Sequence, residues 1–173
     1  ALTKSKEFQI NLNRTTAILA THNHVNHCAE LNVMIDAMTH CGMEHRGLLL
    51  ASKSVVLGTE EMTPTLTKVH SAMPEKVIPM EKNHKVGIDL VEIHAITAEH
   101  TDPTAVGFKF LCPKFTLSYT GDTKLTDKLI EELAGTDILI LCVPYPGNKG
   151  AGMNLDTESA TKIVNVIKPK VAI

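Results

Sequence analysis

The chain has no tryptophan, and aromatic side chains make up only 3% of its 173 residues. Surfaces that bind nucleic-acid bases or sugar rings rely on stacking against such side chains, so the sequence argues against these partners. The chain also lacks an excess of positive charge, since its formal net charge is −2. Neither a nucleic acid nor an anionic membrane surface is therefore expected as a partner.

Long hydrophobic runs and paired cysteines are missing as well. No apolar stretch approaches the roughly 20 residues that span a bilayer, and the mixed, polar start of the chain has no secretory signal pattern. The four cysteines are widely spaced, without a CxxC pair: Cys28, Cys41, Cys112 and Cys142. This usage predicts reduced, mostly buried thiols in a cytoplasmic protein rather than a disulfide framework.

The chain instead alternates short apolar runs with amphipathic segments, without repeats or linkers, which predicts a single domain over residues 1–173. Strands are predicted at residues 17–20, 47–51, 76–80, 86–97, 107–110, 115–119, 137–143 and 170–173. Helices are predicted over residues 31–38 with a stop near Gly42, after the N-cap Thr126, and between Asp156 and Pro169. Hairpins in the middle, with strand–helix alternation at both ends, favour a mixed α/β sandwich over a doubly wound parallel sheet.

Histidine is the unusual residue, because three of the nine histidines fall within six positions, in the pattern HxHxxH between a predicted strand and a predicted helix. In an extended backbone, side chains two positions apart lie on the same side, so His22 and His24 can face one Zn²⁺. His27, one turn further on, would serve a neighbouring metal. The alternative is a His-rich surface loop without a function.

Two further residues are candidate ligands. His100 follows a long β-rich segment and precedes a loop marked by Pro103, so its imidazole can lie at a sheet edge facing a cleft. Asp122 follows Gly121, which allows an unusual backbone angle, and its carboxylate suits a divalent cation. Taken alone, His100 is more often a loop histidine, and Asp122 is more often a turn residue or a helix cap.

Together these residues resemble the metallo-β-lactamase superfamily, whose signature is HxHxDH. The segment 22–27 matches the signature with one change, His100 falls where the family places its next histidine, and Asp122 falls where the family has its metal-bridging aspartate. Shorter phrases resemble a largely archaeal subgroup of predicted metal-dependent hydrolases, at residues 34–39, 100–103 and 106–108.

The resemblance implies an α+β fold, the four-layer αβ/βα metallo-β-lactamase-type sandwich. An opening β segment and the closing segment of the family have no counterpart in this chain. Ala1 and Ile173 are therefore not expected to be the natural termini of a complete fold.

The resemblance also implies the metal ligands. His22, His24 and His100 would bind a first ion, and His27 and Asp122 a second, with Asp122 bridging. The expected cofactor is zinc, as one or two ions, with manganese or iron as alternatives. The implied chemistry is hydrolysis by a metal-activated water, so that no protein nucleophile is needed.

Two departures from the family bear on catalysis more than on folding. Asn26 stands where the family has an aspartate that helps to bind the second metal and to handle a proton. The asparagine keeps a carbonyl acceptor but has neither a negative charge nor a titratable group. Asn154 lies in a loop where relatives often carry a histidine, so an imidazole that could assist the leaving group would be missing.

The sequence therefore predicts a metal-dependent hydrolase in which a zinc-activated water attacks an ester, lactone, thioester or phosphodiester bond of a small-molecule substrate, with Asp122 and Asn26 at the centre of the chemistry. The rival is a catalytically weakened metal-binding or ligand-binding protein of the same fold, which Asn26 favours. No membrane partner is expected, and a homo-oligomer is left open.

Overall fold

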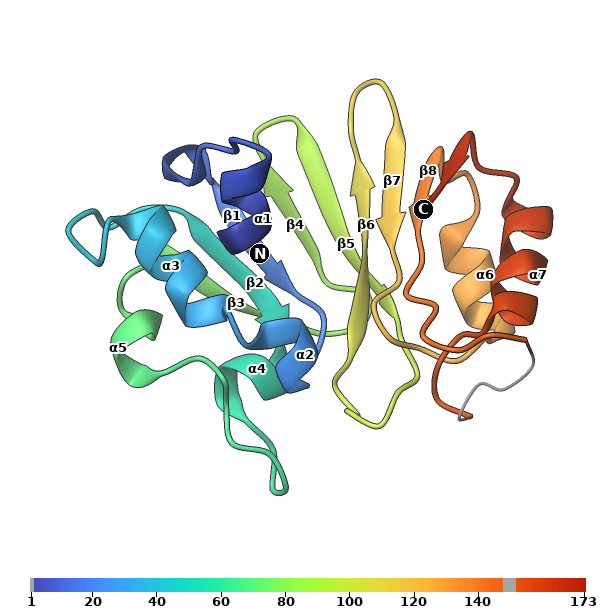
Figure 1. The fold of residues 1–173 in the computed structure, drawn as a ribbon, viewed down its shortest axis with the longest axis horizontal. Coiled ribbons are helices and arrows are strands. Elements are labelled where there is room, and N and C mark those ends of the chain that lie inside the picture. Colours follow the sequence, from blue (N-terminus) through green and yellow to red (C-terminus); the bar gives the residue numbers. More distant parts are fainter. Residues whose placement is uncertain (1, 148–151) are drawn as a thin grey trace. The chain divides into compact units, whose positions relative to one another are not determined.

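The structure, a computed structural model, describes residues 2–147 and 152–173. The chain forms two compact units, Ala1–Met80 and Glu81–Ile173. Each unit has its own sheet and its own helices (Figure 1). Among the described residues, no helix is long and apolar enough to cross a membrane. Whether the two units together form the single domain predicted over residues 1–173 stays a prediction.

The first unit is built on a three-stranded parallel sheet of order β1-β2-β3. Its elements are α1 (Leu2–Glu7), η1 (Leu12–Arg14), β1 (Ala17–Ala20), α2 (Val25–Cys28), α3 (Leu31–Thr39), β2 (Leu48–Ser52), α4 (Lys53–Leu57), α5 (Lys68–Ser71) and β3 (Lys76–Met80). Parallel strands need crossover connections, which here contain α2 and α3, then α4 and α5. As predicted, β3 is an edge strand, where Pro79 can be accommodated because it has no backbone N–H to donate.

Leucine and isoleucine at helical spacing attach α3 to this sheet. Leu31 and Ile35, one helical turn apart, pack with Leu49 of β2 and Val55 of α4 in one apolar cluster. The helix ends at Thr39, because His40 already adopts a left-handed backbone (φ 51°) as the C-cap. The predicted stop near Gly42 is therefore wrong, since a non-glycine residue takes the left-handed position earlier in the chain.

The second unit contains a six-stranded mixed sheet of order β4-β5-β6-β7-β8-β9. Its elements are β4 (Lys85–Ile88), β5 (Val91–Thr97), β6 (Val106–Leu111), β7 (Thr116–Tyr119), α6 (Asp127–Leu133), β8 (Ile138–Ile140), α7 (Thr157–Ile167) and β9 (Val171–Ala172). The first four strands pair antiparallel, and β7, β8 and β9 pair parallel. The β-rich stretch predicted as one segment at 86–97 is a hairpin, because the chain reverses near Asp89, whose φ is 50°.

Both helices of the second unit begin at the predicted caps. The Thr126 side chain accepts a hydrogen bond from the backbone N–H of Leu129, and the Asp156 side chain accepts one from that of Ser159. The helices and the sheet share one apolar cluster, formed by Ile96, Leu129, Leu133, Leu139, Leu155 and Ile163. This cluster holds β8 and the two helices together, and the loops after β5, β7 and β8 extend from it.

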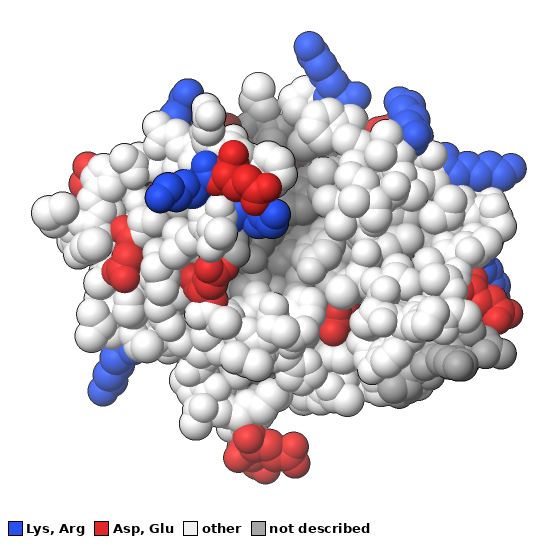
Figure 2. All heavy atoms as spheres, in the orientation of Figure 1, with Lys and Arg blue, Asp and Glu red and all other residues white. Residues whose placement is uncertain are grey.

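Charged side chains do not gather by sign on the face drawn in Figure 2. Lysine and arginine side chains are interspersed with aspartate and glutamate over that face, and uncharged atoms cover most of it. This agrees with the net charge of −2 and offers no basic stripe there for a nucleic-acid backbone.

Candidate metal centre

The histidine segment of the first unit follows the last residue of β1. Its backbone stays extended through His24 (φ −80°, ψ 138°), which is the N-cap of α2. The amides of His27 and Cys28 both donate to the His24 carbonyl, so the chain turns into a helix directly after the second histidine. His22 and His24 are thus separated by extended backbone, and His24 and His27 by one turn of helix. This change of conformation brings the three imidazoles of one short segment together.

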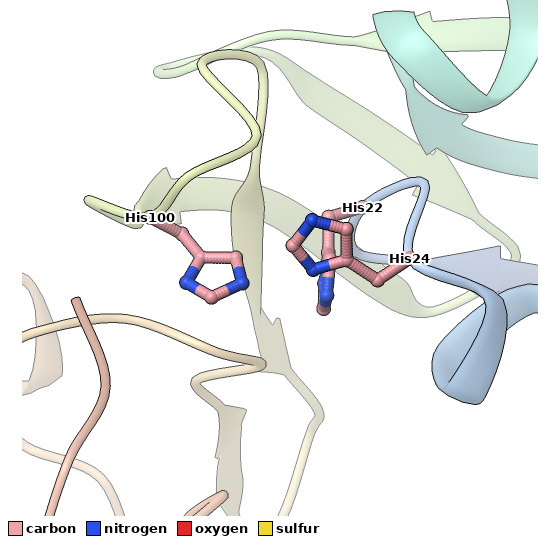
Figure 3. Close-up of side chains that lie close together, drawn as sticks. All are labelled: His22, His24 and His100. Carbon is pink, nitrogen blue, oxygen red and sulfur yellow. The ribbon is translucent and has the colours of Figure 1, made fainter. Parts of the chain in front are cut away.

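His22 lies at the centre of this group and is fully buried. Its ring centroid is 4.8 Å from that of His24, with the two rings nearly perpendicular, and 4.4 Å from that of His27. Figure 3 shows the rings of His22 and His24 side by side in the segment that follows β1. The turn into α2 brings the His27 ring back against His22, so the three imidazoles lie together.

Thr21 orients the buried imidazole. Its hydroxyl oxygen lies 3.0 Å from Nδ1 of His22, and both residues are buried. A hydrogen bond to one ring nitrogen fixes the ring about its axis, as the outer partners of metal-binding histidines do. A bond from His22 to a metal would then fall to Nε2.

In the second unit, His100 and Asp122 lie at the same edge of the sheet. The strands β5 and β7 run in the same direction because each pairs antiparallel with β6 between them. His100 follows the end of β5, and Asp122 follows the end of β7. Nε2 of His100 lies 3.7 Å from Oδ2 of Asp122, and both residues are 8% exposed. That separation exceeds hydrogen-bond length and suits two ligands of one cation.

The tautomer of His100 follows from its other nitrogen. Nδ1 lies 2.8 Å from the backbone carbonyl oxygen of Met153. A carbonyl only accepts, so Nδ1 carries the hydrogen and donates it. In the neutral ring the lone pair is then on Nε2, the atom on the side of Asp122, which is the arrangement that a metal ligand requires. Figure 3 shows the His100 ring projecting from the loop after β5.

The loops that carry these two residues are bonded to each other. The Glu99 amide donates to Oγ1 of Thr123 (2.9 Å), and the Lys124 amide donates to the Glu99 carbonyl (2.9 Å). The side chains of Glu99 and Lys124 form an ion pair at 2.7 Å. Inside the His100 loop, buried Asp102 accepts hydrogen bonds from the amide and the hydroxyl of Thr104. These bonds tie the two loops to each other.

A cysteine that the sequence did not single out lies next to Asp122. Burial, together with the neighbouring Asp122 carboxylate, raises the pKa of the Cys142 thiol to about 12. Burial also raises the pKa of Tyr119, with Cys142 and Asp122 adding to the shift. All four cysteines are free thiols, and only Cys28 is fully buried, so the prediction of mostly buried thiols is wrong.

The two asparagines differ in their surroundings. Asn26 is exposed on α2 and, with the neighbouring His27, lines a hollow of about 410 Å³ beside β1 and α3. Asn154 is half-buried in the loop before α7, and within the described residues its Oδ1 is buried without a hydrogen-bond partner.

The predicted ligands thus form two sets, each inside one unit: His22, His24 and His27 in the first, and His100 and Asp122 in the second. Each set is close-packed and buried or half-buried, and its donors are imidazole nitrogens and one carboxylate. Zinc takes such ligands. That the two sets bind the same ions stays a prediction.

The sequence profile of the Beta-lactamase superfamily domain matches residues 3–173. The chain belongs to this family. A relative in Methanocaldococcus jannaschii, an uncharacterized protein, is 28% identical over 170 residues. The match covers 98% of this chain and 64% of that relative.

Solved structures agree on the fold. The metallo-beta-lactamase fold protein YhfI from Bacillus subtilis has a TM-score of 0.77 at 17% identity, with 100% of this chain and 71% of that chain covered. A diphosphatase from the PhnP family has a TM-score of 0.71 at 16% identity, covering 99% and 65%. The short form of human tRNase Z has a TM-score of 0.65 at 14% identity, covering 99% and 78%. The predicted α+β fold of the metallo-β-lactamase type is thereby confirmed.

Proposed function

We propose that this chain is the metal-binding part of a metal-dependent hydrolase. The observation that carries the proposal is the complete burial of His22 against two further imidazoles from the same short segment. Such a concentration of neutral nitrogen donors is typical of zinc and other transition-metal sites, and membership of the family supports it. The chain spans 64% of the length of its archaeal relative, so the activity of the whole protein belongs to the proposal.

In this proposal His22, His24 and His100 bind one ion, and His27 and Asp122 bind a second, with Asp122 bridging. The close packing inside each set supports the assignment, together with the order of these residues in the family resemblance. We propose zinc, as one or two ions, because imidazole nitrogens dominate the set and only one carboxylate is present. Manganese and iron accept the same donors and are the alternatives.

Divalent ions bound by these residues would supply Lewis acidity and acidify a water towards neutral pH. The chain itself orients the donors. The Met153 carbonyl keeps the hydrogen of His100 on Nδ1, and the Thr21 hydroxyl engages Nδ1 of His22. Asp122 is the only group of the proposed site that can accept a proton as a carboxylate, because Asn26 is a neutral amide.

The proposed substrate is a small molecule with an ester, lactone, thioester or phosphodiester bond. Structures of similar fold include a diphosphatase and an isothiocyanate hydrolase, so the fold itself does not select the bond. The scattered charge on the face in Figure 2 favours a small substrate over a long nucleic acid. A cytoplasmic location is proposed from the four free thiols.

Metal content tests the proposal directly. The chain is purified, loaded with zinc and freed of excess metal, and the bound zinc is measured by mass spectrometry. We expect one or two ions per chain and the loss of most of the first ion in His22→Ala. The matched control is His45→Ala, the same substitution at an exposed histidine of the same unit, which should keep the wild-type content. A wild-type chain that retains no metal would refute the proposal.

A second candidate function is a metal-binding or ligand-binding protein with weakened catalysis. It is favoured by Asn26, which lies beside His27 in the lining of the hollow and brings no charge. The zinc-loaded protein is assayed on a panel of generic esters, thioesters, lactones and phosphodiesters. Metal retention with hydrolysis of any class supports the hydrolase, whereas metal retention without hydrolysis supports the binding protein.

A further inference from the structure

The histidine segment of the first unit is bonded to a loop of the same unit. This loop spans residues 58–67 and joins α4 to α5 (Figure 1). The Thr65 hydroxyl donates a hydrogen bond to Oδ1 of Asn23 at 2.6 Å, and Nδ2 of Asn23 donates one to the Thr63 carbonyl at 2.8 Å. Asn23 is the residue between the first two histidines, so its carboxamide joins the centre of the histidine segment to the loop.

The orientation of this carboxamide follows from its partners. A backbone carbonyl only accepts hydrogen bonds, so the NH₂ group of Asn23 faces Thr63 and its oxygen faces Thr65. The sulfur of the buried Cys28 lies 3.2 Å from the Thr65 hydroxyl oxygen and 3.1 Å from the His24 carbonyl oxygen. The network therefore reaches the histidine segment at two points, the Asn23 side chain and the His24 backbone.

The loop is itself bonded to two helices of its unit. Nδ2 of Asn32, on α3, donates to the Thr65 carbonyl at 2.9 Å, and Oδ1 of Asn32 accepts from the Thr67 amide at 3.3 Å. The Leu66 amide donates to the Val55 carbonyl of α4 at 3.1 Å, and the Leu66 side chain is buried in the apolar cluster of this unit. A side chain that is bonded to Thr65 is thereby connected to the packed core of the unit.

The Asn23 side chain and the two imidazoles beside it go in different directions. The rings of His22 and His24 lie together, with 4.8 Å between their centroids, whereas the side chain between them goes to the loop. This is the alternation of an extended backbone. A hydrogen-bonded side chain on one face therefore restrains the backbone from which both imidazoles project on the other face.

We propose that Asn23 is a positioning residue, which holds His22 and His24 in the directions that one metal ion requires. The inference rests on the proposed function, in which these two histidines bind the first ion. Asn23 is not a ligand, and it acts through its neighbours, as the outer partners of metal-binding residues do. Its role complements that of Thr21, whose hydroxyl restrains the rotation of a single ring.

Nuclear-spin relaxation of the metal-free protein tests the positioning by itself. Thr65→Val removes the hydroxyl at nearly constant size, and Thr65→Ser keeps it. We expect lower amide order parameters for residues 22–24 in Thr65→Val, and values close to the wild type in Thr65→Ser. The matched control is Thr63→Val, because Asn23 bonds to the backbone carbonyl of Thr63, which this variant keeps. Order parameters that are the same in the wild type and in Thr65→Val would overturn the inference.

Titration with Co²⁺ tests the consequence for metal binding. We expect Asn23→Ala and Thr65→Val each to weaken the ion bound through His22 and His24 by about tenfold, and Thr65→Ser to restore most of the affinity. Thr63→Val should bind Co²⁺ as the wild type does. A residue that only stabilised the fold would change the unfolding of the metal-free protein in urea and leave the Co²⁺ affinity of the folded protein unchanged.

Two results of the titration would contradict the inference by itself. One is equal affinity in the wild type and Thr65→Val. The other is equal weakening by Thr63→Val and Thr65→Val, since it would trace the effect to the loop as a whole and not to the bond with Asn23. A wild-type protein that binds no Co²⁺ would instead refute the proposed function, and with it the role of Asn23 in metal binding.

Discussion

The two units gather their candidate ligands in opposite ways. In the first unit, three imidazoles come from six consecutive residues, and the turn from extended backbone into α2 suffices to pack their rings. In the second unit, His100 and Asp122 are far apart in sequence, and they meet because β5 and β7 run in the same direction on either side of β6.

This difference predicts different sensitivities. The three imidazoles of the first unit stay close together as long as residues 22–27 keep their backbone conformation. The proximity of His100 and Asp122 depends instead on the register of the strands and on the apolar cluster that packs against the sheet. The hydrogen bonds between the two loops of the second unit help to keep His100 and Asp122 in place. Both loops nevertheless extend from strands of the same sheet, so they still depend on its pairing.

The largest expected effect comes from truncating a buried leucine in each unit. Leu139→Ala and Leu49→Ala both remove a side chain with 0% exposure, and each should cost about 2–5 kcal/mol of unfolding free energy in urea. Hydrogen exchange separates them. Only Leu139→Ala should speed exchange of the Thr120 amide, which bonds to Ile140 of β8. Equal acceleration by both variants would show that the two units open together and would break the comparison.

Asn26→Asp sharpens the comparison on the side of the first unit. The new carboxylate adds negative charge beside His27, where Asp122 is otherwise the one charged donor proposed for the second ion. We expect the second ion to bind roughly tenfold more tightly, about 1.4 kcal/mol, and hydrolysis to rise if the protein is an enzyme. Asn13→Asp, at another exposed asparagine of this unit, is the control. Unchanged zinc affinity and rate would mean that Asn26 is not near a metal.

Much of this arrangement was accessible from the sequence, for reasons tied to particular residues. The spacing of His22, His24 and His27 encodes their proximity directly, because only local backbone geometry intervenes. His100 and Asp122 were candidates from their local sequence, and their order in the family resemblance is what joined them to the histidine segment. Cys142 was missed because its proximity to Asp122 depends on the register between β7 and β8, which leaves no local pattern.

Two other features of the structure could not be predicted from the sequence, for different reasons. The bond from His100 to Met153 uses a backbone carbonyl, which every residue has, so no residue type signals it. The early end of α3 depends on His40 in a left-handed conformation, which the sequence gives little reason to expect outside glycine and asparagine.

Lys109→Met tests the packing of the second unit away from the ligands. The half-buried ammonium donates to the carbonyls of Glu132 (2.8 Å) and Ala134 (2.7 Å) at the end of α6. Burial lowers the pKa of Lys109, which reduces the net benefit of the charge. We expect a loss of about 1 kcal/mol in urea unfolding. Lys114→Met, at an exposed turn, should have a smaller effect, and equal losses would contradict this role.

The smallest expected effect concerns Asp137. Hydrogen bonds from the Lys170 side chain and the Thr116 amide lower the pKa of this carboxyl from its ordinary value of 3.8. Because the folded-state pKa is the lower one, the contribution of Asp137 to stability is present above pH 3.8 and is lost as the pH falls through the lowered value. The stability difference between the wild type and Asp137→Asn should therefore shrink on acidification. A difference independent of pH would contradict this assignment.

The bonds between Glu99, Thr123 and Lys124 also have a consequence for motion. The two loops are joined by one backbone–backbone hydrogen bond, one bond from a backbone amide to a side-chain hydroxyl, and an ion pair, so we expect them to move together on the nanosecond timescale. Nuclear-spin relaxation should report matched order parameters for the amides of residues 99 and 124. A disturbance that reaches either loop, such as a substrate pressing on one of them, would then be felt by His100 and Asp122 together.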